Sequence, residues 1–314
     1  MKYDITALGE ILIDFVPSGV DGAGDSVFAR KAGGAPVNML AAVSAFGGKT
    51  AFIGKVGVDM FGRFLCASLR ECGISADGLV FDGGHTTTLA FVELDKNGDR
   101  DFVFLRENGA DRFLRKEEVN ADIIKSSKMF HFGSLSLTND PSREATEYAL
   151  DVAKKAGCVI TYDPNYRAPL WKDRSAATEM MKKHLDKVDI LKISADELEM
   201  LFGSDESAAV KELQTLGVRV ILVTDGAERA SVYLKNGSIC LPSEKFAAVD
   251  TTGAGDIFFG VFLSEWLKNG STLENITPAQ AAAYLKKAVH IAGKSTEQKG
   301  AIAPLRDIER LCER

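Results

Sequence analysis

Apolar runs of strand length alternate with stretches of helical periodicity along most of the chain. The runs at 3–8 and 218–223 predict strands, and the second is rich in β-branched residues, as is typical of a parallel sheet covered on both faces. Residues 60–71 and 195–202 predict helices, because each stretch ends close to a glycine. Further strands are predicted at 50–53, 128–132, 158–162 and 190–193, and further helices at 35–46, 143–155 and 211–216. The alternation predicts an α/β fold with a mostly parallel central sheet flanked by helices.

One segment departs from this alternation. Two predicted strands, 86–93 and 100–106, are separated by a turn that contains Asn97-Gly98, a strong hairpin signal. Short extended runs also occur between residues 10 and 32. Because no linker or internal repeat interrupts the chain, we expect one domain, residues 1–314, with a small second sheet formed by insertions at about 10–32 and 86–112.

The segment 250–256, Asp-Thr-Thr-Gly-Ala-Gly-Asp, precedes an apolar stretch that predicts a buried helix. Its two glycines allow backbone N–H groups to converge at the helix N-terminus, a combination that binds phosphate or developing negative charge. Asp256, in the first turn, is placed to accept a hydroxyl proton during phosphoryl transfer. The segment alone also fits a capped helix that packs through its glycines, so both interpretations stay open at this point.

Two common nucleotide-binding motifs are absent. Gly-Lys-Thr at 48–50 and Gly-Lys-Ser at 293–295 resemble the end of a Walker loop, but Val43 and Ala288 occupy the position of its first glycine. The first strand is not followed by G-x-G-x-x-G, which disfavours a nicotinamide dehydrogenase.

The composition of the chain limits the partners that it is expected to bind and the compartment in which it is expected. The net charge is -6, and the absence of a basic cluster argues against a nucleic acid or an anionic membrane as partner. No apolar window is long enough for a membrane span, and Asp4, Glu10 and Asp14 interrupt the N-terminal apolar stretch, so export is not expected. The five cysteines form no CxxC pair and the four histidines are dispersed, which indicates a cytoplasmic protein with reduced thiols and no zinc site.

The chain resembles the ribokinase-like sugar kinases, or phosphofructokinase-B family, over essentially its whole length. Two segments carry the resemblance: 250–256, and Gly-Gly-Ala-Pro-Val-Asn at 33–38, which is followed by Gly-Lys-Val-Gly at 54–57. The resemblance implies a ribokinase-like fold in which the small β-sheet is a lid over the sugar. It also implies that ATP, with Mg²⁺ and a monovalent cation such as K⁺, phosphorylates a primary hydroxyl. Asp256 would be the base, and Gly253, Ala254 and Gly255 the anion hole.

The same resemblance implies a set of sugar contacts. Phe104 and Arg106 lie in a stretch similar to the lid strand of bacterial fructokinases, and Asn165 and Arg167 follow a predicted strand. On the residues alone, Asp14 also fits an edge-strand charge that blocks aggregation, and 163–167 also fits a plain turn. The implied sugar-binding residues are Asp14, Gly33, Gly34, Asn38, Phe104, Arg106, Asn165 and Arg167.

The nucleotide and cation sites are implied in the same way. Thr224 and Gly226 follow the strand at 218–223 and resemble the nucleotide-phosphate turn, to which Gly253 and Gly255 also contribute. Ser194 replaces the asparagine common in the family, whereas Glu197, which would act on Mg²⁺ through water, is retained. Asp250 and Thr252 would offer backbone oxygens to the monovalent cation.

The sequence therefore predicts a sugar kinase, with D-fructose as substrate and fructose 6-phosphate as product. A 2-keto-3-deoxygluconate kinase and a nucleoside kinase are the alternatives within the family. A non-catalytic sugar or nucleotide sensor is the alternative from a different class, and Asp256 argues against it because a sensor needs no base. Exposed lid edges leave a homodimer through the lid open.

Overall fold

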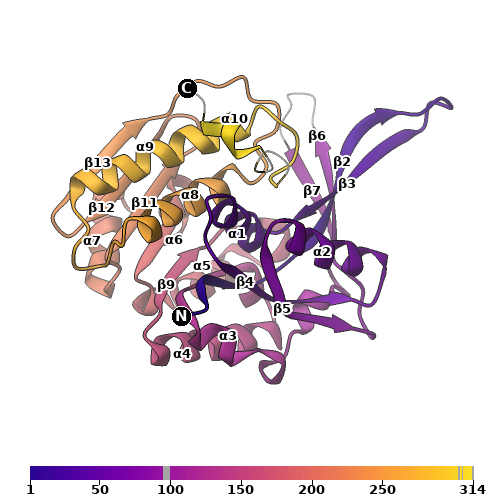
Figure 1. The fold of residues 1–314 in the computed structure, drawn as a ribbon, viewed down its shortest axis with the longest axis horizontal. Coiled ribbons are helices and arrows are strands. Elements are labelled where there is room, and N and C mark those ends of the chain that lie inside the picture. Colours follow the sequence, from indigo (N-terminus) through magenta and orange to yellow (C-terminus); the bar gives the residue numbers. More distant parts are fainter. Residues whose placement is uncertain (95–99, 303–304, 306, 313–314) are drawn as a thin grey trace.

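The computed structural model of the chain describes residues 1–94, 100–302, 305 and 307–312, and Figure 1 shows its fold. The Asn97-Gly98 turn predicted for the hairpin lies outside these residues. Within them, no helix is both long and apolar enough to cross a membrane.

A nine-stranded sheet forms the centre of the molecule, in the order β13-β12-β11-β10-β9-β8-β1-β4-β5. The seven strands from β11 to β5 pair in parallel, and β12 and β13 add an antiparallel edge. The strands are β1 (Tyr3–Leu8), β4 (Thr50–Gly57), β5 (Ile74–Asp82), β8 (Ser127–Gly133), β9 (Val159–Asp163), β10 (Ile190–Ser194), β11 (Val220–Asp225), β12 (Arg229–Leu234) and β13 (Gly237–Pro242). The predicted fold class is confirmed.

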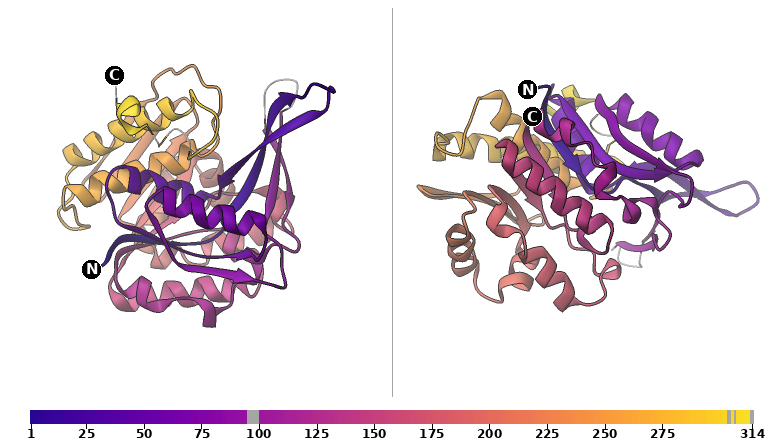
Figure 2. Two further views of the ribbon diagram at one scale, coloured as in Figure 1. Left: turned by 45° about the vertical axis from the view of Figure 1, so that its right-hand side comes forward. Right: turned by 90° about the horizontal axis from the view of Figure 1, so that it is seen from below.

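Helices cover both faces of this sheet and enclose two hydrophobic cores (Figure 2). One core is formed with α1 (Ala35–Ala45), α2 (Met60–Glu71), α8 (Ala254–Lys268), α9 (Pro278–Ser295) and α10 (Ile308–Cys312). The other is formed with α3 (Ala121–Lys125), α4 (Ser142–Ala156), α5 (Arg174–Lys182), α6 (Ala195–Phe202) and α7 (Glu206–Leu216). Short 3-10 turns occur at Ala110–Phe113, Lys116–Glu118, Leu135–Leu137, Ala168–Leu170 and Leu185–Lys187.

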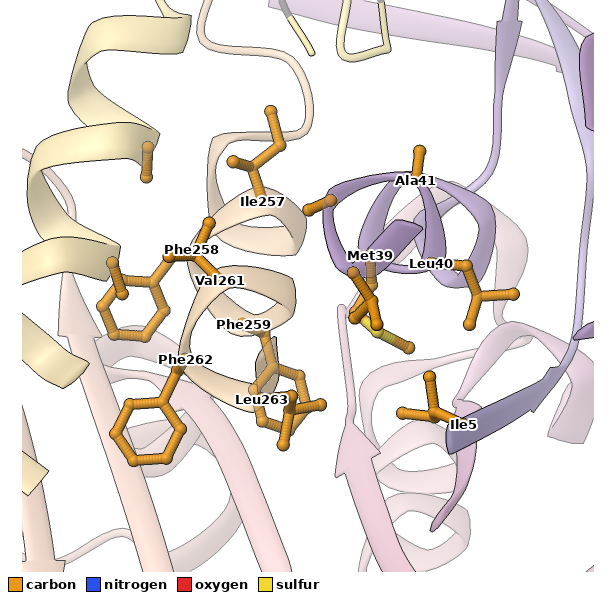
Figure 3. Close-up of a cluster of buried hydrophobic side chains, with 14 of the residues drawn as sticks. Ile5, Met39, Leu40, Ala41, Ile257, Phe258, Phe259, Val261, Phe262 and Leu263 are labelled. Atoms are coloured by element: carbon orange, nitrogen blue, oxygen red, sulfur yellow. The ribbon is translucent and has the colours of Figure 1, made fainter. Parts of the chain in front are cut away.

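Helices α1 and α8 approach each other closely. Phe259 and Leu263 of α8 are buried in the same cluster as Met39 and Leu40 of α1, as Figure 3 shows. A Cβ atom at Gly260 would lie 2.5 Å from the backbone oxygen of Met39, so only glycine fits this contact without a shift. The contact holds the two helices in fixed register, and both begin at the same end of the large sheet.

A second sheet of four strands, in the order β3-β2-β6-β7, lies at that end. It consists of β2 (Leu12–Val20), β3 (Ser26–Gly33), β6 (Leu89–Leu94) and β7 (Arg100–Leu105). The two chain segments join because β2 pairs in parallel with β6. In Figures 1 and 2, β2 and β3 project beyond the body of the molecule.

Several predicted boundaries are wrong, and two of them have a local reason. The strand predicted from residue 86 begins at Leu89, because Thr87 is held by Asp59, the N-cap of α2, through its backbone N–H and its hydroxyl. The helix predicted from residue 211 begins at Glu206, where the Asp205 side chain accepts the backbone N–H of Ala208. A short polar first turn hides a helix start from a search for apolar periodicity.

Candidate active site

The N-terminus of α8 is a tight turn that depends on glycine. Gly253, the N-cap, has a φ of 75°, and a Cβ atom there would collide with Ala301. The turn thus directs the first amides of a long helix toward one point, where they and the helix dipole favour a negative charge. Asp256 lies in the same first turn.

The Asp256 carboxylate is buried, and it joins the first turns of α8 and α1. Its Oδ2 accepts a hydrogen bond of 2.9 Å from Nδ2 of Asn38. Burial raises the pKa of Asp256, although the Asn38 hydrogen bond and the nearby cations Lys192 and Arg167 act in the opposite direction. A carboxylate with a raised pKa is a stronger proton acceptor in its ionised form, which suits a general base.

A small cavity of about 60 Å³ adjoins this carboxylate, between the small sheet and the first turns of α1 and α8. Its lining residues are Glu10, Leu12, Asp14, Gly34, Ala35, Asn38, Phe104, Leu135, Asn165, Arg167, Thr252, Gly253 and Asp256. Asp14 comes from β2, where its carboxylate packs so tightly against Gly33 that a side chain at 33 would collide with it. The structure thus brings most of the predicted sugar contacts to one cavity, which we call the sugar cavity.

Two polar atoms at the sugar cavity are buried without a hydrogen-bond partner in the described structure: Oε2 of Glu10 and Oδ1 of Asn38. The other Glu10 oxygen, Oε1, accepts the backbone N–H of Ala35 at 3.0 Å. Burial raises the pKa of Glu10 to about 7. Glu10 is not among the site residues expected from the sequence, although a carboxylate two residues after the first buried strand of an α/β sheet lies where ligands bind.

Arg106 is buried but does not line the sugar cavity. Its guanidinium donates to Asp111 at 2.7 Å, to Thr138 at 2.9 Å and to the backbone oxygen of Leu135 at 3.0 Å. These bonds tie the end of β7 to the segment after β8. A contact between Arg106 and the sugar therefore stays a prediction. The hydrogen bonds of Arg106 indicate that it supports the end of β7.

A larger cavity of about 430 Å³ lies on the other side of the α8 turn, and we call it the nucleotide cavity. Ala254, Gly255 and Thr251 line it from the turn, and Thr224 and Gly226 line it from the end of β11. Phe246, Phe258, Val289 and Ala292 give it an apolar wall. Gly293 leaves room for Phe246, since a Cβ atom there would collide with the ring. An apolar slot beside an anion-binding turn fits a purine base with its phosphates.

A third, polar cavity of about 510 Å³ opens beside the turn. Its lining residues are Asn165, Tyr166, Arg167, Arg174, Lys192, Ser194, Asp196, Glu197 and Met200. Asn165 and Arg167 line both this cavity and the sugar cavity, and Asn165 has an unusual positive φ of 48°. Strained backbone of this kind is frequent at functional sites.

Ser194 and Glu197 form a capping box at the start of α6, because each side chain accepts the backbone N–H of the other. Glu197 also accepts the backbone N–H of Tyr166 at 2.6 Å. Asp250 is engaged similarly, since it accepts the backbone N–H groups of Thr252 and Gly300, both at 2.8 Å. Within the described residues, no three His, Cys, Asp or Glu side chains form a metal cluster. A Mg²⁺ ion that is held mainly by nucleotide phosphates and water needs only one such carboxylate. Glu197 lines the polar cavity, and its role toward Mg²⁺ through water stays a prediction.

A buried carboxylate at a helix N-terminus, between a small cavity and a larger one with an apolar wall, is the arrangement expected of a small-molecule kinase. The chain belongs to the pfkB family of carbohydrate kinases, and residues 2–308 match the sequence pattern of that family. The family prediction is therefore confirmed, and the protein is a carbohydrate kinase.

Individual relatives agree with this assignment. The chain is 42% identical to probable fructokinase-5 of Arabidopsis thaliana over 96% of its own length and 94% of that protein. Among solved structures, it is similar to fructokinase from Xylella fastidiosa with bound ATP, with a TM-score of 0.90, 30% identity and coverage of 99% and 98% of the two chains. It is also similar to a double mutant of fructokinase from Vibrio cholerae O395 with fructose, ADP and a potassium ion bound, with a TM-score of 0.86, 28% identity and coverage of 97% and 96%.

Proposed function

We propose that the protein transfers the γ-phosphoryl group of ATP to the primary hydroxyl of D-fructose and yields fructose 6-phosphate. The observation that carries the proposal is the position of Asp256, which lines the sugar cavity at the turn that also lines the nucleotide cavity. The fructokinase names of the relatives support the choice of sugar.

The proposed reaction is a direct transfer. Asp256 accepts the proton of the sugar hydroxyl as that oxygen bonds to the γ-phosphorus, and the bond to the β,γ-bridging oxygen breaks so that ADP leaves. The turn formed by Gly253, Ala254 and Gly255 stabilises the negative charge that develops on the transferred group. Asn38 orients the Asp256 carboxylate through its hydrogen bond.

The sugar is recognised by oxygens that lie around the small cavity. Asp14 and the unpartnered oxygens of Glu10 and Asn38 accept hydrogen bonds from its hydroxyls, and the Gly34 backbone approaches the ring closely. Gly33 does not line the cavity but leaves room for the Asp14 carboxylate. Phe104 supplies an apolar surface from β7. Asn165 and Arg167, which line two cavities, face the junction of sugar and phosphate.

Thr224 and Gly226 contact the nucleotide phosphates in this proposal, and Ser194 positions Glu197 through the capping box. Glu197 would hold Mg²⁺ through water, and the backbone oxygens of Asp250 and Thr252 would hold K⁺. These cations supply positive charge that offsets the charge of the phosphates.

Charge at the sugar cavity supports fructose over a 2-keto-3-deoxy acid. Glu10, Asp14 and Asp256 give the cavity three carboxyl groups, and Arg167 is the arginine that lines it. A substrate carboxylate would be repelled there, whereas a neutral polyol finds acceptors.

The experiment is a coupled ADP-release assay on fructose, 2-keto-3-deoxygluconate and a set of nucleosides. We expect kcat/KM for fructose to exceed that for the keto acid by about tenfold or more, which is about 1.4 kcal/mol of transition-state binding. Asp14→Ala should weaken fructose use strongly and leave ATP affinity nearly unchanged. Faster turnover of the keto acid or of a nucleoside would overturn the choice of fructose but not the kinase class.

The base is tested by Asp256→Asn. The amide oxygen can still accept the Asn38 hydrogen bond, so the helix contact persists while the proton acceptor is lost. We expect kcat to fall by about 10²–10⁴ with ATP binding preserved. Turnover within about tenfold of wild type would contradict the assignment of the base.

We also propose a homodimer through the lid, in the cytoplasm. The edge strands of the small sheet expose apolar side chains: Phe28 on β3, and Val103 and Leu105 on β7. The free thiols of all five cysteines suit a reducing compartment. Sedimentation should give twice the chain mass, and Val103→Lys with Leu105→Lys should give the monomer. A wild-type monomer at micromolar concentration would contradict the dimer.

A further inference from the structure

Lys192 is a buried cation that the chemistry described above does not use. It lies in β10 beside Asp163, the last residue of β9, and its side chain is only 8% exposed. A charge inside a parallel sheet is costly unless it is compensated, and even a compensated pair is often no more stable than apolar residues. Because the charged Lys192 lies toward the carboxyl ends of these strands, where the site is, its position suits a role in the site better than a role in stabilising the fold.

The ammonium is held from two sides. Nζ donates to both carboxylate oxygens of Asp163, at 3.0 Å and 3.3 Å. On the other side it lies against the anion-binding turn, since a Cβ atom at Gly255 would be 3.0 Å from Nζ. Lys192 also lines the polar cavity together with Arg167. Its charge is therefore placed between that cavity and the turn to which a phosphoryl group would bind.

The surroundings keep Lys192 protonated. Burial acts to lower the pKa of Lys192, but the carboxylates of Asp163, Glu197 and Asp256 outweigh it and raise the pKa. An ammonium has three N–H donors, and the contacts with one carboxylate leave a donor for a ligand. A donor fixed in advance in a buried site is worth more than one in water, because it needs no reorganisation during the reaction.

We propose that the Lys192 ammonium contacts the transferring phosphoryl group and stabilises its transition state, with Asp163 as a positioning residue. This role rests on the kinase function proposed above. As the sugar oxygen bonds to the γ-phosphorus and the bond to the β,γ-bridging oxygen breaks, the hydroxyl proton passes to Asp256 and negative charge moves toward ADP. Lys192 adds a full positive charge beside the amides of the turn, which carry only partial charges.

The experiment separates this role from that of a buried ion pair that only supports the sheet. Lys192→Gln combined with Asp163→Asn removes both charges together and leaves two amides that can still hydrogen-bond. Asp163→Asn alone is the matched control, because it keeps the lysine and removes one of the three carboxylates that favour its ammonium, while Glu197 and Asp256 remain. Each variant is assayed on the sugar that wild type uses fastest. Affinity for ADP with aluminium fluoride and that sugar, a mimic of the transferring group, is measured beside affinity for ADP alone.

We expect the double variant to lose about 10²-fold in kcat, with KM for sugar and ATP within about threefold of wild type. Its affinity for the aluminium fluoride complex should fall with kcat, while its affinity for ADP is kept. The Asp163→Asn control should stay within about tenfold of wild-type kcat. A folded double variant with wild-type kcat would overturn the role of Lys192 and leave the kinase function intact.

Lys192→Arg serves if the double variant does not fold. It preserves an ion pair with Asp163 but moves the charge relative to Gly255, so kcat should fall at least about tenfold while the melting temperature is kept. Full activity of this variant would also overturn the role. No turnover of any sugar by wild type would instead overturn the kinase function on which the role depends.

Discussion

Buried carboxyl groups from distant segments of the chain meet at the sugar cavity, and their burial has a thermodynamic cost. Burial raises the pKa of both Glu10 and Asp256. A group whose pKa is higher in the folded state than in the unfolded state stabilises the fold at low pH and loses that contribution as pH rises through its folded pKa. Without a ligand in the sugar cavity, the folded protein should therefore be less stable at high pH. A ligand that donates hydrogen bonds to these groups should restore that stability.

Glu10→Gln tests this for one residue. The pKa of Glu10 is about 7 in the fold against 4.5 for the ordinary side chain, which corresponds to about 3 kcal/mol of stability lost between about pH 4 and pH 8. Glutamine cannot ionise, and its oxygen can still accept the backbone N–H of Ala35. Between about pH 4 and about pH 8, the free energy of unfolding of the variant should therefore rise by about 3 kcal/mol relative to that of wild type.

Urea unfolding of both proteins at about pH 4 and about pH 8 measures the shift. All other buried groups titrate in both proteins, so their contributions cancel in the difference. A difference that is the same at both pH values would contradict the raised pKa of Glu10.

Single residues of the site differed in how far the sequence predicted them. Asp256 and Gly253 could be singled out because the turn and the carboxylate are contiguous in the chain, and the roles expected of them stay predictions. Glu10 and Lys192 could not, since each is polar for reasons supplied from elsewhere: the N-terminus of α1 for Glu10, and Asp163 on the next strand for Lys192. An isolated charge in an apolar strand signals that some partner exists but does not name it.

At the scale of elements, the position of the base depends on how α8 packs against α1. Both helices begin at the site, where Asn38 bonds Asp256, and Gly260 lets them touch one turn farther along. The sequence predicted both helices but not their contact, because an apolar surface around a whole helix does not show which neighbour it meets.

Gly260→Ala tests this contact. In an open helical position alanine stabilises a helix by up to about 1 kcal/mol relative to glycine. Here the added Cβ would lie 2.5 Å from the Met39 backbone oxygen and 2.7 Å from the Ala42 side chain. We therefore expect the opposite sign, a loss of about 1–3 kcal/mol in free energy of unfolding, measured by urea titration. Activity should fall as well, because α8 carries Asp256. A more stable variant would show that the helices can separate without cost.

At the scale of the whole molecule, the site lies between two sheets built from interleaved segments of the chain. Helix α8, which covers the nine-stranded sheet, supplies Asp256 and part of the nucleotide cavity, and the four-stranded sheet supplies Asp14 and Phe104. The sequence predicted two sheets because an Asn-Gly hairpin broke the α/β alternation. It could not predict that β2 pairs with β6, since parallel pairing of distant strands leaves no local signal.

This arrangement predicts that the small sheet closes over the sugar in solution. Fructose that is bonded to Asp14 on β2 and held near Asp256 on α8 would link the two sheets, and lids commonly close over substrate in this way. Saturating fructose should therefore slow backbone hydrogen exchange in residues 87–106, and in β2 and β3, by mass spectrometry. Helix α4, which packs on the opposite face of the large sheet, provides an internal control and should be unaffected. Asp14→Ala should abolish the slowing because it removes the lid's contact with the sugar. Exchange that is unchanged in the small sheet of the wild-type enzyme at saturating fructose would show that the sheet is a fixed wall and not a lid.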